Sequence, residues 1–190
     1  MKTNNGDSLG TEWNIDPMHT TVGFSVRHLM ITNVRGVFDQ VSGTVRYDAD
    51  APERTELRVE IPAASINTRQ PQRDAHLRSP EFFDAESHPL VRFQSTAARK
   101  ADNGSLEVTG NLTMRGVTRE IVLTISEISP VLPDHRGVPR VGANATAKVK
   151  RSEFGMLYNR VLEAGRLAVG DDVSLSFDVS LEKAGVSPTA

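Results

Sequence analysis

Apolar and polar residues alternate strictly between residues 21 and 29. Val22, Phe24, Val26 and His28 share one face, while the positions between them are polar or glycine. This period of two is typical of a β-strand with one face in an apolar interior and the other in water. His28 is the exception on the apolar face, because a titratable imidazole is costly there unless it has a hydrogen-bond partner.

The same alternation recurs along the chain and predicts roughly eight strands. They cover residues 21–29, 37–47, 57–61, 91–94, 105–114, 121–125, 141–149 and 173–181. We expect a turn at Asn33–Gly36, a bulge between residues 39 and 42, and a tight turn at Gly116. Strands that are polar outside and apolar inside favour an antiparallel sheet around one interior, and closing that sheet into a barrel removes its edges.

Residues 68–86 interrupt the strand pattern. Pro71 can occupy the first position of a helix, and residues 73–78 have the composition of one or two helical turns that end at Ser79-Pro80. The adjacent Phe82 and Phe83 follow on a second short turn and need an apolar surface to cover. Because a barrel has open ends, we interpret this segment as a short helical lid over one of them.

The predicted inner face of residues 141–149 is unusually small. Three of its five members are alanine, and Gly110 faces inward on another predicted strand. Small inward side chains leave volume in a barrel unless large ones opposite fill it. The large inward candidates are Phe24, Phe93, Phe177 and Met114. The pattern therefore predicts either a ligand cavity or a core that these four side chains pack.

Length and composition narrow the class of protein. A chain of 190 residues suits one all-β domain, with hydrophobic content of 38% and charged content of 24%. The formal net charge of −2 gives no electrostatic reason to expect nucleic acid or an anionic membrane as a partner. No run of 18 apolar residues is present, so we expect no stable membrane insertion. We expect a barrel domain at residues 12–183 between disordered tails at residues 1–11 and 184–190.

The sequence lacks the usual motifs of metal and serine-hydrolase chemistry. It contains no cysteine, no histidine pair at i, i+4 spacing and no HExxH motif. It also lacks the GxSxG motif of serine hydrolases. We therefore assign no catalytic residue, no metal site and no cofactor. The N-terminus has no apolar segment of the kind found in signal peptides, and we expect a cytoplasmic protein.

Several motifs, in this order, resemble those of the YceI-like polyisoprenoid-binding proteins, over about residues 12 to 182. They are Trp13-x-Ile15-Asp16-x-x-His19-Thr20, Phe24-x-Val26-Arg27-His28-Leu29, Gly36-x-Phe38, Ile66-x-Thr68, Arg73-Asp74-x-His76-Leu77-Arg78-Ser79, Phe82-Phe83-Asp84, Phe93-x-Ser95-Thr96, Gly110-x-Leu112-Thr113, Arg115-Gly116-Val117, Arg151-x-x-Phe154-Gly155 and Val169-Gly170-Asp171. The resemblance implies an all-β fold, an eight-stranded antiparallel lipocalin-like β-barrel with a short helical lid segment. It also implies a pore that holds a long isoprenoid or similar amphiphile, and a homodimer.

We therefore expect a protein that binds a polyisoprenoid or other long-chain lipid in the barrel, for storage, transport or sequestration. Two alternatives stay open at this point: an enzyme that acts on such a lipid with His19, His28 and Asp16 as acid–base groups, and a plain interaction module. His28 can be a ligand contact or a structural histidine. The expected ligand-binding residues are His19, Val22, Phe24, Val26, His28, Phe82, Phe83, Phe93, Leu112, Met114, Ala143, Ala145, Ala147, Phe154, Leu175 and Phe177.

Overall fold

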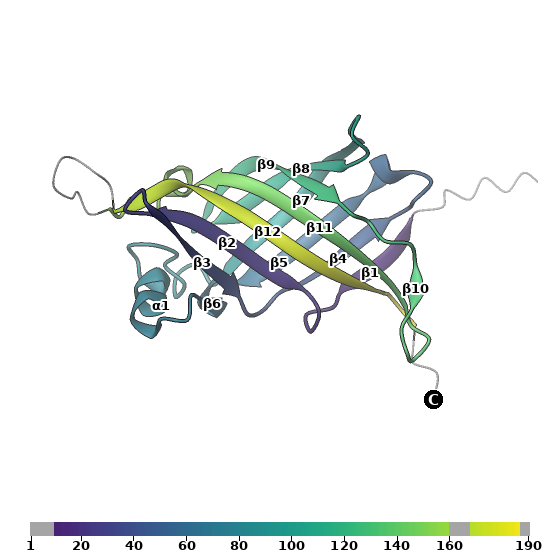
Figure 1. The fold of residues 1–190 in the computed structure, drawn as a ribbon, viewed down its shortest axis with the longest axis horizontal. Helices are drawn as coiled ribbons and strands as arrows, with labels where there is room; N and C mark the ends of the chain where they lie inside the picture. Colours follow the sequence, from purple (N-terminus) through teal and green to yellow (C-terminus); the bar gives the residue numbers. More distant parts are fainter. Residues whose placement is uncertain (1–9, 160–167, 187–190) are drawn as a thin grey trace, which may run out of the picture.

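The alternating segments form an antiparallel β-barrel in a computed structural model that describes residues 10–159 and 168–186 (Figure 1). Eight strands close the ring in the order β12, β1, β4, β5, β7, β8, β9 and β11, and β11 pairs again with β12. The predicted eight-stranded barrel with one short helix is therefore confirmed. The ring strands are β1 (Thr11–Ile15), β4 (Ser42–Tyr47), β5 (Glu56–Pro62), β7 (Leu90–Lys100), β8 (Leu106–Met114), β9 (Val117–Ser126), β11 (Pro139–Lys150) and β12 (Val169–Lys183).

Further short elements extend this ring. β2 (Thr21–His28) pairs with β12, and β3 (Thr32–Phe38) and β6 (Ile66–Asn67) continue outward from β2. β10 (Leu132–Pro133) pairs with the start of β11. The remaining elements are the helix α1 (Pro71–Arg78) and the 3-10 helices η1 (Pro52–Arg54), η2 (Ala63–Ser65) and η3 (Arg151–Phe154).

β12 organises the wall because it is long enough to pair with two successive strands on one side. It pairs with β1 at Leu181–Lys183 and with β2 between Val169 and Asp178, with a register shift between Val169 and Val173. Residues 16–20 connect β1 to β2 as a turn beside β12, where the Asp16 backbone N–H donates to Ser180 O at 2.9 Å. β1 was not predicted from the alternation.

Two local predictions between residues 28 and 42 are wrong. Residues 33–36 lie inside β3 rather than in a turn, and the turn is formed by Leu29 and Met30, whose φ values are +52° and +60°. Ile31 completes the connection, since His28 pairs with Thr32. Positive φ at two successive positions matches the twist of a hairpin, and here that geometry prevails although bulky residues rarely adopt it. The predicted continuous strand 37–47 is instead split, because β3 ends at Phe38 and β4 begins at Ser42.

The predicted tight turn at Gly116 is confirmed between β8 and β9. Arg115 and Gly116 both have positive φ, and Met114 pairs with Val117. The expected disordered tails fall mostly outside the described residues, which exclude 1–9 and 187–190. Thr11, assigned to the first of these tails, begins β1.

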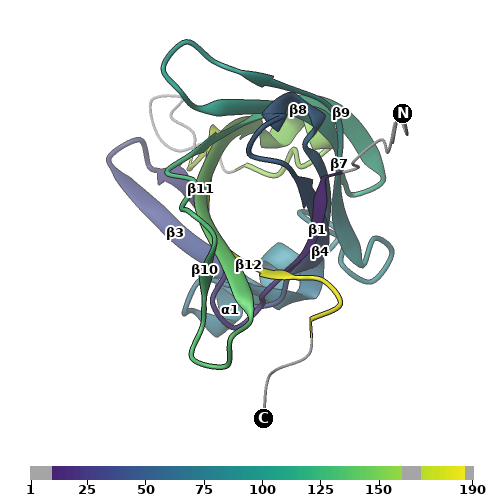
Figure 2. The same cartoon turned by 90° about the vertical axis from the view of Figure 1, so that its right-hand side faces the viewer.

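The two ends of the barrel differ. The end where β1 begins and β12 ends, here called the terminal end, carries β10 and faces the viewer in Figure 2. The opposite end, called the lid end, carries α1 and η3 (Figure 1). The predicted helix begins at Pro71 as expected, and Gln70 caps it by accepting a hydrogen bond from the Arg73 backbone N–H.

Polar contacts fasten α1 to the barrel. The buried carboxylate of Asp74 accepts hydrogen bonds from the Thr68 backbone N–H at 2.8 Å and from the Thr68 hydroxyl at 2.5 Å. Arg73 donates to the Thr68 carbonyl, and Arg78 donates to the carbonyls of Ala64 and Ile66. These bonds satisfy a buried carboxylate and several carbonyls at once, so they fix the lid segment against β6 and η2.

Candidate ligand cavity

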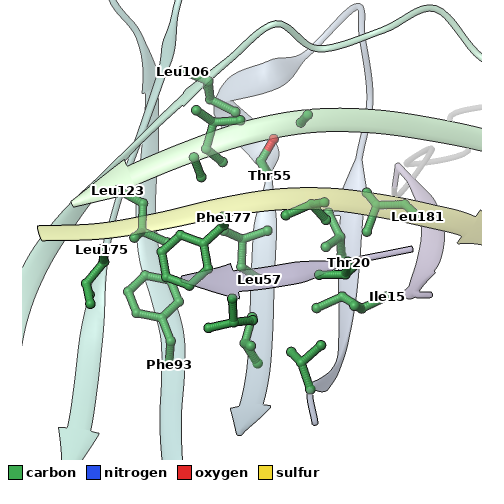
Figure 3. Close-up of a pocket in the computed structure, with 18 of the residues that line it drawn as sticks. Ile15, Thr20, Thr55, Leu57, Phe93, Leu106, Leu123, Leu175, Phe177 and Leu181 are labelled. Atoms are coloured by element: carbon green, nitrogen blue, oxygen red, sulfur yellow. The ribbon is translucent and has the colours of Figure 1, made fainter. Parts of the chain in front are cut away.

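The barrel encloses a cavity of about 130 Å³, part of whose wall is drawn in Figure 3. Among residues 10–159 and 168–186, its wall is apolar except for Thr20, Tyr47 and Thr55, and none of these residues contributes a charged side chain to it. The lining residues are Ile15, Thr20, Val22, Val41, Val45, Tyr47, Thr55, Leu57, Val59, Ile61, Val91, Phe93, Leu106, Leu112, Ile121, Leu123, Ile125, Ile128, Val141, Ala143, Ala145, Leu175, Phe177, Val179 and Leu181.

Alternation along β11 and β12 places small residues beside large ones in this wall. Ala145 on β11 pairs with Phe177 on β12, and Ala143 pairs with Val179. All four face the cavity. The alanines leave room beside the larger neighbours, so the inward face of β11 contributes volume, as the sequence predicts for Ala143 and Ala145.

Gly110 does not contribute empty volume. A Cβ atom at Gly110 would lie 2.4 Å from the Phe93 ring, which therefore covers the glycine directly. Gly36 on β3 is covered in the same way by the ring of Phe24, at 2.4 Å. At these two positions a phenylalanine from a neighbouring strand occupies the space that the missing side chain leaves. Of the two alternatives that the sequence left open, the packed one therefore holds at Gly110.

Aromatic side chains fill the lid end. The ring centroids of Phe24 and Phe38 are 5.8 Å apart, and those of Phe38 and Phe83 are 5.7 Å apart. Phe154 in η3 is completely buried, and Met114 at the end of β8 is 7% exposed. Because this end is packed, the cavity occupies the barrel from its middle toward the terminal end. The sequence left open a ligand cavity or a packed core. The interior has a packed core near the lid end and a cavity in the other half.

The sequence-predicted ligand residues divide accordingly. Seven lie in the cavity wall: Val22, Phe93, Leu112, Ala143, Ala145, Leu175 and Phe177. Five of the others belong to the packed interior or lie against it: Phe83, Met114, Ala147, Phe154 and Phe24, whose ring contacts Phe38. Phe82 is buried against the rings of His76 and Tyr158. Val26 is half-buried on β2, and the two histidines lie elsewhere.

His19 lies outside the barrel. Its side chain is 71% exposed, and its Nδ1 is 2.7 Å from Oδ2 of the buried Asp16. Burial alone would raise the pKa of Asp16, but hydrogen bonds from His19, the Met18 backbone and Arg140 together lower it. Ile15 and Val141 face the cavity, so their neighbours Asp16 and Arg140 lie on the outer side of the wall.

Arg140 connects three segments on this outer surface. It pairs with Asp16 between β1 and β2, with Asp134 at 3.0 Å and with Glu182 at 3.2 Å. Burial opposes ionisation of Asp134, yet the backbone N–H groups of Arg136 and Val138 and the Arg140 guanidinium hold its pKa well below the usual range. This network joins residues 124 positions apart, and no sequence pattern pointed to it.

His28 is the last residue of β2, at the end of the strand that lies farther from His19. Its ring is half-buried and has no hydrogen-bond partner within residues 10–159 and 168–186. β2, whose eight extended residues span about 23 Å, separates it from His19. The acid–base constellation of His19, His28 and Asp16 is therefore not assembled. In the described part of the chain, no three His, Cys, Asp or Glu residues are grouped to hold a metal ion.

Trp13 was not among the sequence-predicted site residues. It lies on β1 in register with Val45 on β4, and it is 3% exposed. Its Nε1 is the one side-chain nitrogen or oxygen that is buried without a hydrogen-bond partner among the described residues. Tyr47, two positions beyond Val45, faces the cavity. Burial raises the pKa of its hydroxyl, and the nearby negative charge of Asp48 raises it further. Strict alternation at Trp13 and Ile15 was the available signal, but it covers too few residues to identify a strand.

No helix within the described ranges is long and apolar enough to cross a membrane.

Comparison with known proteins identifies relatives over most of the chain. A UPF0312 protein of Pseudomonas savastanoi pv. phaseolicola is 33% identical over 153 residues, which are 80% of this chain and 79% of the relative. The solved Campylobacter jejuni YCEI protein is 33% identical, with a TM-score of 0.69 over 96% of this chain and 99% of its own.

A polyisoprenoid binding domain from Saccharophagus degradans shares the fold alone. Its TM-score is 0.65 at 16% identity, over 92% of this chain and 99% of its own. The model of the YceI-like domain matches residues 13–181. The chain therefore belongs to the YceI-like domain family.

Proposed function

We propose that this protein binds a long-chain apolar or amphiphilic lipid, a polyisoprenoid or similar molecule, in the barrel cavity, and stores, transports or sequesters it. The observation that carries the proposal is the cavity wall, which in the described part of the chain is apolar at all but three positions and has no charged side chain. Such a wall offers nothing to replace the hydration of a charged ligand, whereas each buried methylene contributes about 0.8 kcal/mol.

The fold comparison supports the same ligand class. The polyisoprenoid binding domain of Saccharophagus degradans has this barrel fold. The enzyme alternative gains no support from the placement of its residues, because Asp16 and His19 contact each other outside the cavity and His28 lies at the far end of β2.

The size of the cavity implies that ligand binding moves side chains. Its volume of about 130 Å³ is close to that of cavities known to hold one benzene-sized molecule, at about 150 Å³. A chain of many carbons needs more space. The largest side chains of the cavity wall are those of Tyr47, Phe93 and Phe177. Figure 3 shows the Phe93 and Phe177 rings in the middle of the cavity. We infer that these two rings rotate aside when a long chain binds.

The homodimer and the cytoplasmic location also belong to this proposal. Sedimentation velocity of the purified protein tests the first, and fractionation of the producing cells tests the second. A monomer at all accessible concentrations would contradict the dimer.

Bound lipid is the direct test of the function. Protein purified without detergent should carry a stoichiometric apolar molecule, seen as a mass increment in native mass spectrometry. The same molecule should appear in an organic extract of the sample and should be lost after denaturation and refolding. A native sample whose mass equals that of the bare chain, and whose extract holds no lipid, would contradict the proposal.

A further inference from the structure

The β2–β3 hairpin ends in apolar residues that the protein does not bury. Figure 1 shows this hairpin at the lid end, and Figure 2 shows β3 outside the ring of strands. Met30 is 56% exposed and Ile31 is 74% exposed. Neither belongs to the hydrophobic core that the described residues form. The hairpin tip, defined here as Met30 and Ile31, therefore presents two large apolar side chains to the surroundings.

The backbone of this turn makes large apolar residues unfavourable there. Leu29 and Met30 have φ values of +52° and +60°, a region that large side chains seldom occupy. Asn-Gly is the usual pair at two such positions in a hairpin, and it would place no apolar side chain in water. The hairpin tip thus improves neither the core nor the turn. Adjacent exposed apolar side chains of this kind indicate contact with an apolar environment outside the chain.

The hairpin is also cationic. Residues 21–38 contain Arg27 and Arg35 but no aspartate or glutamate, although the formal net charge of the whole chain is −2. Arg27 lies opposite Asn33 and Arg35 lies opposite Ser25, so strand alternation places both arginines on one face of the hairpin. Both are exposed, and neither forms an ion pair with a residue in the described ranges. Two cations are therefore available to an anionic partner.

We propose that the hairpin tip inserts into the surface of a lipid bilayer that contains anionic lipid, while Arg27 and Arg35 bind the lipid head groups. The arginines are three and four residues from the tip, about 10–13 Å along extended strands. An apolar segment that enters the interface by about 5–10 Å leaves guanidinium groups at that distance among the head groups.

This docking turns the lid end toward the bilayer, because α1 lies at the same end as the hairpin tip (Figure 1). The contact is peripheral and reversible, since only two side chains enter the membrane. The inference goes beyond the proposed function, because it concerns the outer surface of the protein and does not depend on what the cavity holds.

Vesicle co-sedimentation is the first test. The probe is vesicles made of equal parts of phosphatidylcholine and phosphatidylglycerol, and the wild-type protein should sediment with them. Ile31→Ser should bind about tenfold more weakly or worse, because an isoleucine side chain gains at least that factor on leaving water. Leu132→Ser is the matched control, since Leu132 is 61% exposed but lies on β10 at the terminal end, and it should bind as wild type does. A wild-type protein that stays in the supernatant, or equal losses in the two variants, would overturn the proposal.

The same vesicles test the arginines. Arg27→Gln should weaken binding about fivefold, the effect of one basic residue near an anionic surface, and should leave binding to phosphatidylcholine alone unchanged. Lys100→Gln is the control, because it removes one exposed positive charge at the end of β7 that has no ion pair among the described residues. It should bind as wild type does. Equal losses in both variants would show an effect of net charge alone and overturn the head-group role.

A fluorescent label reads insertion directly. The chain contains no cysteine, so Ile31→Cys and Leu132→Cys each accept one nitrobenzoxadiazole group. Its emission should move to shorter wavelength on vesicles for the label at position 31 and stay unchanged at position 132. A second copy of the chain is the competing partner. A shift that appears without vesicles and grows with protein concentration would show self-association and overturn the proposal. Docking by a protein that carries no lipid in its cavity would support this inference while the proposed function fails.

Discussion

At the scale of single residues, glycines paired with phenylalanines shape the interior. Gly110 and Gly36 each let a neighbouring ring lie against the backbone, at 2.4 Å from where a Cβ would be. We expect Gly110→Ala to destabilise the protein by about 1–3 kcal/mol, because the Phe93 ring and the Gln94 carbonyl leave no room. Gly142→Ala is the matched control on β11, where the nearest atoms are 3.8 Å away. Denaturant unfolding of both variants measures the difference, and equal stabilities would contradict the pairing.

The carboxylates bound by Arg140 predict a pH dependence. Folding lowers the pKa of Asp16 and of Asp134, so their contribution to stability is present above the unfolded value of about 4 and is lost as pH falls below it. The Tm should therefore fall between about pH 5 and pH 2. Asp134→Asn should flatten this fall and lower the Tm at neutral pH. Asp102→Asn changes an exposed carboxylate without an ion pair among the described residues, and it should leave the profile as in wild type.

At the scale of elements, the lid segment depends on one buried carboxylate. Asp74 accepts both the backbone N–H and the hydroxyl of Thr68. Asp74→Ala leaves that N–H without its acceptor, at a cost of about 1–3 kcal/mol. We expect faster amide hydrogen exchange in α1 and β6 and unchanged protection in β8 and β11. Asp172→Ala, an exposed carboxylate on β12, serves as the control. Uniformly faster exchange throughout the barrel would contradict a local role.

The elements also show what sequence alternation can and cannot predict. β8 and β11 follow their alternating segments closely, because a period of two directly encodes an inner and an outer face. The division between β1 and β2 was missed, since it depends on where β12, some 160 residues later, changes partner. Trp13 was missed because β1 has only five residues, too few for the alternation of Trp13 and Ile15 to identify a strand. The inward positions of Ala143 and Ala145 were predicted correctly, because they follow from the alternation of faces along one strand alone.

At the scale of the whole molecule, the barrel is divided into a packed half and an empty half. Alternation assigns Phe24, Phe177, Ala145 and Ala147 to one interior, and it cannot say which half a ligand uses. That depends on contacts across the barrel, such as Phe24 with Phe38 and Phe38 with Phe83. Ala145 faces the cavity, whereas Ala147, two residues along the same face, packs against the core outside it.

This division predicts opposite outcomes for two equivalent substitutions. Ala145→Phe places a ring in empty space between Phe177 and Ile125, its partners on β12 and β9. The variant should keep the Tm of the ligand-stripped wild type and lose the bound lipid, because the ring takes the volume that the chain needs. Ala147→Phe adds the same ring to a filled region, where overpacking costs about 1–3 kcal/mol.

The two readouts are melting temperature and lipid content, both measured on protein purified without detergent. For a chain of this length 1 kcal/mol corresponds to about 2–4 °C in Tm, so Ala147→Phe should melt several degrees below the stripped wild type. The comparison isolates position, because the substitutions are chemically identical and share one strand and one face. If Ala145→Phe is destabilised as much as Ala147→Phe, the interior is packed along its whole length. A chain of many carbons would then have no room beside β11, and a lipid that still copurifies would have to bind outside the barrel.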